Sequence, residues 1–272
     1  MKRRMSAADI VVFIVLFLSM TAAIAAAYTF LMKEADYRAS EKEYEEIRSE
    51  YVRPGKRDDS RSRGITETEE ETEENLPIEP PAVDWEGLKA ENSDIIGWIQ
   101  VLSVGIEYLV LQGDSNDEYL HRSVSGEWRT AGSIFLDSQN SPDMTDHHSI
   151  IYGHNMRNGS MFANLKAFNT PGVLEACPYF WVSTPKKDLL YQIMSIHTSV
   201  TGGGSFTLFP ETARNPAFDS WMEKEINKSN IECKLPDRYI KRMVTLSTCT
   251  PDGDGNRQLV QGILVREAAR QR

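Results

Sequence analysis

The chain has 272 residues, of which 40% are hydrophobic, and 40 acidic against 30 basic residues give it a formal net charge of -10. This acidic balance argues against nucleic acid as a partner, because binding to phosphates requires clustered Lys and Arg. Much of the negative charge lies in one short run at residues 67–74, so the net charge indicates little about a substrate.

The N-terminal segment predicts a membrane anchor. Residues 10–32 contain no charged residue and are long enough to span a bilayer core as a helix. Basic residues at positions 2–4 precede the span, so residues 1–9 are expected in the cytoplasm and everything after the span outside the cell. Small residues at 23–27 leave a cleavable signal peptide as the alternative. The apolar run exceeds the ~7–15 residues of a signal core, which favours an uncleaved, single-pass anchor in the cell membrane.

Residues 33–81 predict a charged extracellular stalk in two parts. Residues 33–53 place Tyr and Ile among Glu, Lys and Arg, a pattern typical of a weakly amphipathic helix that serves as a spacer. Residues 54–81 are acidic, end in prolines and hold few large apolar groups. This second part is expected to be disordered and extended, and to hold the folded region away from the membrane.

Residues 82–272 remain as one folded domain of about 190 residues, enough for a sizeable core. Short apolar segments bounded by turn formers recur through it, whereas helical patterns are few. The predicted strands cover residues 95–101, 106–112, 132–137, 149–154, 179–184, 189–200, 242–249 and 258–266. The predicted helices cover residues 83–91, 160–168 and 216–228. Many strands with few helices predict a mainly β fold, a closed or nearly closed barrel with peripheral helices.

A cysteine and an arginine are predicted to meet at one rim of this barrel. Cys249 lies where the strand 242–249 ends and a run of turn formers begins, and Arg257 starts the returning strand. A guanidinium beside a thiol favours the reactive thiolate, and it also stabilises the oxyanion of an acyl-transfer intermediate. The structural alternative is a buried cysteine with a surface arginine.

A histidine occupies the same kind of position. His154 follows the apolar strand that begins at Ser149, with a glycine directly before it. Cysteine catalysis requires an imidazole that is near in space rather than in sequence, and the 95 residues between His154 and Cys249 are compatible with that requirement. The pattern therefore predicts a Cys–His–Arg site.

The other cysteines lack this setting. Cys177 precedes a proline in a loop and Cys233 lies in a polar segment, so neither is expected to be a nucleophile. A disulfide between Cys177 and Cys233 remains open, because two cysteines alone do not decide such a pairing.

The other histidines also receive structural interpretations. His147 and His148 are adjacent, would point to opposite sides of an extended chain, and are expected in a surface loop, which argues against a metal site. His121 and His197 are expected to be structural or surface groups. No metal and no cofactor are expected.

The site motifs resemble those of the sortases, a family of Gram-positive cell-surface transpeptidases. The motifs are Tyr152-Gly-His-Asn155 and Thr245-Leu-Ser-Thr-Cys249, with Arg257 following. Further segments resemble class B sortases in particular, at residues 83–92, 94–99, 116–121, 131–137 and 158–162. The resemblance covers roughly residues 83–266. It implies an eight-stranded barrel, with an N-terminal helix and a helix in the 201–241 connection as class B additions.

The resemblance also implies a reaction and its partners. Cys249 would attack a C-terminal sorting signal of an exported protein and form a thioester, which an amine of a peptidoglycan precursor then resolves. His154 would donate and accept the proton, and Arg257 would hold the carbonyl or the oxyanion. The class B resemblance suggests a pentapeptide of the Asn-Pro or Ser-Pro type, ending in Thr-Gly or Thr-Asn.

Pocket residues follow from the same resemblance. Asn116 and Leu120 are expected on one wall, Tyr152 and Ser247 near the catalytic pair, and the 201–241 connection as a lid. Three alternatives remain open: a secreted cysteine hydrolase with water as the acceptor, a catalytically idle wall-binding module, and a pilus-polymerising sortase.

Overall fold

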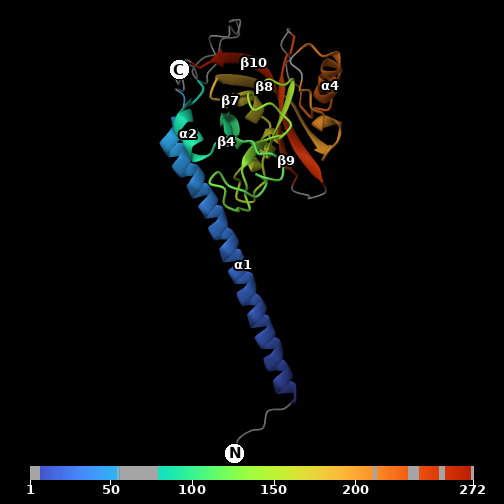
Figure 1. The fold of residues 1–272 in the computed structure, drawn as a ribbon. Helices are drawn as coiled ribbons and strands as arrows, with labels where there is room; N and C mark the ends of the chain where they lie inside the picture. Colours follow the sequence, from blue (N-terminus) through green and yellow to red (C-terminus); the bar gives the residue numbers. More distant parts are fainter. Residues whose placement is uncertain are drawn as a thin grey trace, which may run out of the picture.

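Eight strands close into a barrel in the computed structural model, which describes residues 7–53, 55, 79–210, 213–231, 239–250 and 255–270. Around the barrel the strands follow the order β10-β8-β7-β3-β4-β5-β6-β9, and a long helix projects from one edge (Figure 1). The strands are β3 (Ile95–Val101), β4 (Ile106–Leu111), β5 (Ile134–Leu136), β6 (His148–Tyr152), β7 (Tyr179–Ser183), β8 (Lys187–Val200), β9 (Met243–Cys249) and β10 (Asn256–Ala269). All eight predicted strands are confirmed, as is the mainly β barrel.

The barrel interior is built from aliphatic and aromatic side chains that the strands turn inward. Ile99, Val110, Val182, Leu246 and Val260 are all completely buried. Their β-branched and apolar character suits a pleated, buried surface. Strands β6 and β9 run parallel whereas β9 and β10 run antiparallel, so the C-terminal ends of β6 and β9 and the start of β10 lie at one rim.

The peripheral helices begin at side chains that cap them. Asp84 accepts a hydrogen bond from the Gly87 N–H at 3.1 Å at the start of α2 (Trp85–Glu91), and Asn215 caps α4 (Pro216–Asn227) in the same way. The predicted helix at 160–168 is instead the 3₁₀ helix η4 (Ala163–Asn169). The remaining short elements are η3 (Leu102–Val104), α3 (Val173–Ala176) and η5 (Gly204–Phe206).

The membrane-anchor segment and the first part of the expected stalk form one continuous helix, α1 (Ala7–Tyr51). Its N-terminal half is apolar and exposed, and by length and composition it could cross a membrane. Further along, five positions at helical spacing are buried or half-buried against the barrel: Tyr37, Ser40, Tyr44, Ile47 and Tyr51. The interpretation of residues 33–53 as a spacer is therefore wrong for this part of the helix, because its apolar stripe packs on the core.

The residues on either side of the acidic segment pair with each other. Strand β1 (Val52–Arg53) pairs antiparallel with β2 (Ala82–Val83), with Val52 opposite Val83 and Arg53 opposite Ala82. Residues 54 and 56–78 lie outside the described residues, so their expected disorder stays a prediction. The expected role of residues 54–81 as a spacer also stays a prediction; the structure shows only that the chain on either side of the segment is paired through β1 and β2.

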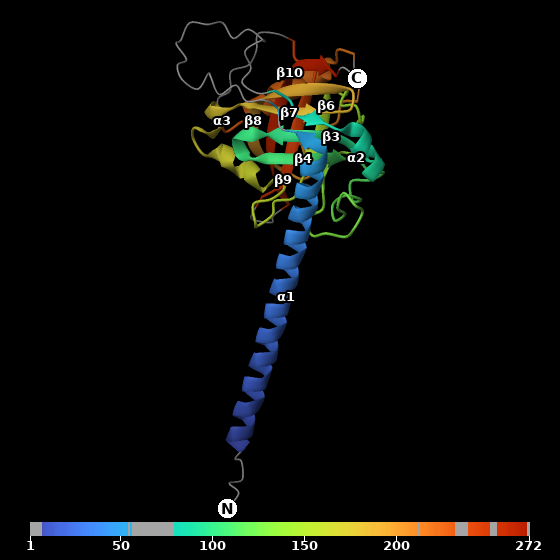
Figure 2. The ribbon, with the colours of Figure 1, turned by 90° about the vertical axis from the view of Figure 1, so that its left-hand side faces the viewer.

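Helix α1 emerges beside the site rim of the barrel. The loops that follow β4 and β6, green to yellow-green in the two views, lie at the edge from which α1 projects (Figures 1 and 2). Helix α1 and these loops therefore share one side of the molecule.

Candidate active site

Strand register brings the three predicted catalytic residues to one rim. Tyr152 of β6 lies opposite Ser247 of β9, and the Gly153 N–H donates to the Ser247 carbonyl at 3.1 Å. His154 and Cys249 each lie two residues beyond that pair, while Arg257 of β10 is the cross-strand partner of Cys249. The expected meeting of a cysteine, a histidine and an arginine follows from the parallel β6–β9 pairing.

Arg257 contacts the Cys249 sulfur directly. Its Nη1 donates to Sγ at 2.8 Å, and its Nε donates to the Thr201 hydroxyl at 3.3 Å. The same hydroxyl donates to the Gly255 carbonyl at 2.6 Å. The guanidinium therefore bonds both the Cys249 sulfur and a hydroxyl that is itself fixed by the backbone. Cys249 is half-buried, so part of the residue is exposed to solvent. Arg257 thus places a fixed cation at hydrogen-bond distance from the sulfur.

The carbonyl of Leu120 orients the His154 ring. His154 Nε2 lies 2.7 Å from this oxygen, and a carbonyl only accepts hydrogen bonds, so Nε2 carries a proton. Burial lowers the pKa of His154, and the nearby His121 and Arg257 lower it further, against the opposing effect of the Leu120 hydrogen bond. The neutral imidazole is therefore favoured. In this form Nε2 carries the proton, and Nδ1 is the nitrogen that can accept one.

Two further rings stack outward from His154. His121 lies 5.4 Å from His154, with 21° between the ring planes, and Trp128 lies 5.9 Å from His121. Trp128 is 67% exposed. His121 was expected to be a structural or surface group, and no motif singled out Trp128. Only the tertiary structure places them beside the histidine.

A glycine allows the Leu120 carbonyl to reach His154. Gly132 has a φ of +54°, and a Cβ at this position would lie 2.3 Å from the Leu120 oxygen. Glycine is the residue that combines this backbone conformation with so close an approach. The predicted pocket residue Leu120 thus acts at the site through its backbone.

Two of the predicted pocket residues share one carboxylate. Asn116 Nδ2 and the Tyr152 hydroxyl each donate to Asp137 Oδ2 at 2.9 Å, and Asp137 is buried. Burial, together with the Asp137 charge, raises the pKa of Tyr152, so its hydroxyl stays protonated as a donor. Asp137 was not predicted as a site residue. Its position at the end of an expected strand was the only available signal.

Ser247 lies behind the rim rather than on it. Its side chain is completely buried, and its hydroxyl has no hydrogen-bond partner within the described part of the chain. Its carbonyl accepts the bond from Gly153 that aligns β6 with β9. Direct contact of Ser247 with a substrate stays a prediction.

Asn155 is a further residue of the site that sequence reasoning did not single out. Its Nδ2 donates to the Cys249 carbonyl at 2.9 Å, which ties the loop after His154 to the end of β9. Its place next to His154 in the motif was the signal that could have found it.

The expectation that His147 and His148 lie in a surface loop is wrong. Both are buried, and each uses both ring nitrogens. His147 bonds the carbonyls of Ala213 and Lys241, and His148 bonds the Thr207 carbonyl at 2.6 Å and the Thr245 hydroxyl at 2.7 Å. The 201–241 connection covers this face of the barrel, a cover that local sequence could not reveal.

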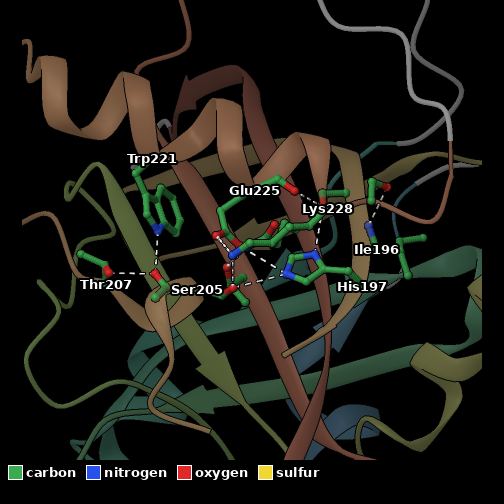
Figure 3. A network of polar contacts seen from close by, with 12 residues as sticks. Ile196, His197, Ser205, Thr207, Trp221, Glu225 and Lys228 are labelled. Carbon is green, nitrogen blue, oxygen red and sulfur yellow. Dashed lines mark hydrogen bonds and ion pairs between the residues drawn. The ribbon is translucent and has the colours of Figure 1, made fainter. Parts of the chain in front are cut away.

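A buried polar network fastens α4 to the same face (Figure 3). Glu225 lies 3.3 Å from His197 Nε2 and 2.5 Å from Lys228 Nζ, and it also accepts from Gln261 at 3.3 Å. Although burial disfavours its charge, the hydrogen bonds from His197 and Lys228 lower the pKa of Glu225 to about 2. This confirms a structural place for His197.

Two further expectations concern a disulfide and a metal site. Cys233 lies outside the described residues, so its pairing with Cys177 stays a prediction. Among the residues that are described, no group of three or more His, Cys, Asp or Glu side chains is arranged to hold a metal ion.

Known proteins resemble this chain in sequence and in fold. Residues 99–265, which include the candidate site, match the family model of the sortase domain. The chain is 35% identical over 185 residues to sortase B of Listeria monocytogenes, covering 65% of this chain and 72% of that protein. The structure of Clostridium perfringens sortase B aligns with a TM-score of 0.62 and 28% identity, over 67% of this chain and 100% of that one. A Staphylococcus aureus sortase B–substrate complex aligns with a TM-score of 0.60 and 26% identity, over 67% and 84% of the two chains.

Proposed function

This chain belongs to the sortase family as a class B member and is a cysteine transpeptidase, and from this premise we propose that Cys249 is its nucleophile. The Cys249 thiolate attacks a carbonyl carbon in the sorting signal of an exported protein. The C–N bond breaks, the amine departs with a proton, and a thioester remains. An amine of the cell wall then attacks the thioester, which releases Cys249 and joins the protein to peptidoglycan.

The contact between Arg257 and the Cys249 sulfur carries this proposal. At 2.8 Å the guanidinium lies against the sulfur that attacks the substrate. After attack the negative charge moves from sulfur to the carbonyl oxygen, within reach of the same planar group. Arg257 therefore supports both the nucleophile and the oxyanion.

His154 moves the proton. Because Nε2 is bonded to the Leu120 carbonyl, Nδ1 is the atom that gains and loses a proton during turnover. As imidazolium, His154 protonates the departing amine, and as neutral imidazole it accepts a proton from the incoming amine. Its lowered pKa favours the second role at neutral pH.

The Asn116–Asp137–Tyr152 group forms a wall of the proposed peptide site. Asp137 fixes both donors, so the wall is organised before the substrate binds. We assign Asn116, Leu120, Tyr152 and Ser247 to substrate binding, for a pentapeptide of the Asn-Pro or Ser-Pro type. Residues 82–272 serve as the catalytic domain in this proposal, and the start of the 201–241 connection, where Thr201 accepts from Arg257, borders the site.

The same proposal places the enzyme at the cell surface. Residues 10–32 of α1 span the membrane, with residues 1–9 in the cytoplasm and the barrel outside, where exported proteins and wall precursors meet. No cofactor takes part.

Acyl-enzyme formation tests the proposal. Full-length protein is incubated with candidate pentapeptides, and mass spectrometry detects the adduct at Cys249. Cys249→Ala should form no adduct, whereas the matched variant Cys177→Ala should form it at the rate of the unaltered protein. Adduct formation by Cys249→Ala would overturn the assignment.

The acceptor is tested in the same reaction. Triglycine or hydroxylamine should change the product and speed the release of the acyl group from Cys249. If neither amine alters product or rate, water is the acceptor and the protein is a hydrolase.

A further inference from the structure

We propose that His121 and Trp128 form the subsite for the acyl acceptor, a primary amine at the end of an extended peptide whose peptide groups stack on these two rings. The inference rests on the proposed function, because it takes Cys249 as the bearer of the thioester and His154 as the base. It adds where the amine and the chain behind it bind, which the proposed chemistry leaves open.

The first step is the place where the acceptor amine reacts. A C–N bond forms as the C–S bond of the thioester breaks, the electron pair returns to the Cys249 sulfur, and the amine proton passes to His154. Because Nε2 of His154 is bonded to the Leu120 carbonyl, Nδ1 accepts this proton. The attacking nitrogen therefore lies within hydrogen-bond distance of His154, and the chain attached to it lies on the surface next to that ring.

The second step is that this neighbouring surface is aromatic. The His121 ring lies 5.4 Å from the His154 ring, and the Trp128 ring lies 5.9 Å from His121 with 28° between the planes. Outside α1, the exposed large hydrophobic side chains among the described residues are Trp128, Val200 and Tyr239, and Trp128 is the most exposed at 67%. A single exposed apolar side chain is ordinary, but this one extends the ring stack of the proposed base.

The third step is that the loop carrying the two rings is held in one conformation. The Ser123 N–H donates to the Glu127 carbonyl at 2.8 Å, and the Arg129 N–H donates to the His121 carbonyl at 3.0 Å. Residues 121–129 therefore form a short hairpin in the connection between β4 and β5. Both rings belong to this hairpin, so their spacing is set before a ligand binds.

Contacts with the rest of the domain fix the hairpin in place. Arg122 is the bridge partner of Trp128, and its carbonyl accepts from the Ser133 hydroxyl at 2.8 Å. Val124 is buried, and its carbonyl accepts from Asn92 Nδ2 at 2.8 Å. A surface that is already ordered binds a peptide without the entropic cost of ordering a loop.

The fourth step is the length of acceptor that the rings require. The two ring spacings place the indole at most about 11 Å from the His154 ring, a distance that an extended peptide covers in about three residues at ~3.4 Å each. The amine then reacts beside His154, the next peptide group passes His121, and the third residue meets Trp128. A planar peptide group laid on the indole face buries apolar area there.

The fifth step is the choice of the acceptor over the segment that leaves the sorting signal. Both amines pass His154, because the second half of the reaction mirrors the first. The leaving segment must depart before an acceptor enters, and a subsite that retained it would favour the reverse reaction. The acceptor arrives from solvent, and the Trp128 ring is open to solvent.

The test measures release of the acyl group from Cys249 by amines of increasing length. Full-length protein is acylated with one pentapeptide, and mass spectrometry follows transfer to glycinamide, diglycinamide or triglycinamide. Hydroxylamine serves as an amine without a peptide. In the unaltered protein, the concentration that gives half-maximal release should fall about fivefold to tenfold from glycinamide to triglycinamide, the scale of one aromatic contact.

Trp128→Ala should remove the advantage of the longer amine. The half-maximal concentration of triglycinamide should rise about fivefold to tenfold, while those of glycinamide and hydroxylamine should stay within about twofold. Trp128→Phe keeps a flat ring and should retain most of the advantage. The matched control is Tyr239→Ala, which removes an exposed aromatic ring before β9, the strand whose other end carries Cys249, and it should change none of these values.

Three results would overturn the inference. The first is equal use of the three glycine amides by the unaltered protein, and the second is an unchanged length dependence in Trp128→Ala. The third is an equal loss for all amines in Trp128→Ala, which would mean that Trp128 only positions His154. Failure of the unaltered protein to form the Cys249 adduct, or a release that no amine accelerates, would instead count against the proposed function.

Discussion

Strand β6 joins two histidines in contrasting surroundings. His148 begins the strand beneath the 201–241 connection, is completely buried and has partners for both ring nitrogens. His154 follows the other end of the strand, is half-buried and bonds Leu120 through one nitrogen. Burial lowers the pKa of both rings, to about 4 for His148. A perturbed pKa therefore does not separate the proposed catalytic histidine from the structural one, whereas its place at the rim that holds Cys249 and Arg257 does.

The same contrast extends to the charged groups of β10 and α4. Arg257 contacts a sulfur at an open rim, while Glu225 is enclosed by His197, Lys228 and Gln261 beneath α4. The Glu225 carboxylate is bonded by His197, Lys228 and Gln261, and these contacts hold α4 in one position on the barrel. In the proposed function, the Arg257 guanidinium at the rim also donates to the carbonyl oxygen of the bound substrate.

The largest difference is expected between the two histidines. His154→Ala should lower acyl-enzyme formation by roughly 10²–10⁴-fold, the usual contribution of a general acid–base, with little change in stability. His148→Ala should keep the acylation rate per folded molecule but lower the free energy of unfolding by about 2–4 kcal/mol, because buried partners lose their hydrogen bonds. Stopped-flow mass spectrometry and denaturant titration measure the two effects. A His148 variant with slow acylation but normal stability would erase the contrast.

Arg257 sharpens the comparison at the rim. Arg257→Ala should slow thioester formation about a hundredfold, the scale of losing one oxyanion donor. Arg257→Lys should recover little of the rate, because an ammonium lacks the planar fork that reaches both Cys249 and Thr201. Single-turnover kinetics with one peptide give both rates. Near-normal acylation by Arg257→Ala would make this arginine a surface residue without a chemical role.

The smallest expected effect is a pH dependence of stability that comes from the enclosed groups. The folded-state pKa of about 4 for His148 lies below the usual 6.5, so its contribution is complete above about pH 6.5 and is lost as the pH falls toward 4. The pKa of about 2 for Glu225 lies below 4.5, so its contribution is lost between about pH 4.5 and 2. Each group contributes on the order of 3 kcal/mol at most.

Denaturant titrations across this pH range measure both windows. His148→Gln should flatten the upper window and leave the lower one, and Glu225→Gln should do the reverse. A free energy of unfolding that stays constant from pH 7 to 4.5 in the unaltered protein would contradict the assignment to His148.

Local sequence predicted the strands because apolar, β-branched runs bounded by turn formers carry their own signal. It also located Cys249, His154 and Arg257, since each lies at the end or the start of such a strand. It failed for His147 and His148, because their burial depends on partners that lie between 59 and 97 positions away in the chain. It also missed Asp137, which accepts from Asn116 and Tyr152, and Asn155, which donates to the Cys249 carbonyl. These partners are distant in the chain.

The sequence by itself determined the elements and the chemistry of this protein: an apolar span, eight strands, and a thiol, an imidazole and a guanidinium at strand ends. The span and the strands follow from composition and from the spacing of apolar residues, which are local properties of a chain. The tertiary structure decided which backbone carbonyl orients His154, which rings stack on it, and where the acidic segment returns. It also decided that α1 packs on the barrel instead of standing apart as a stalk. These contacts join residues distant in the chain, and they form only when burial of the shared core brings the residues together.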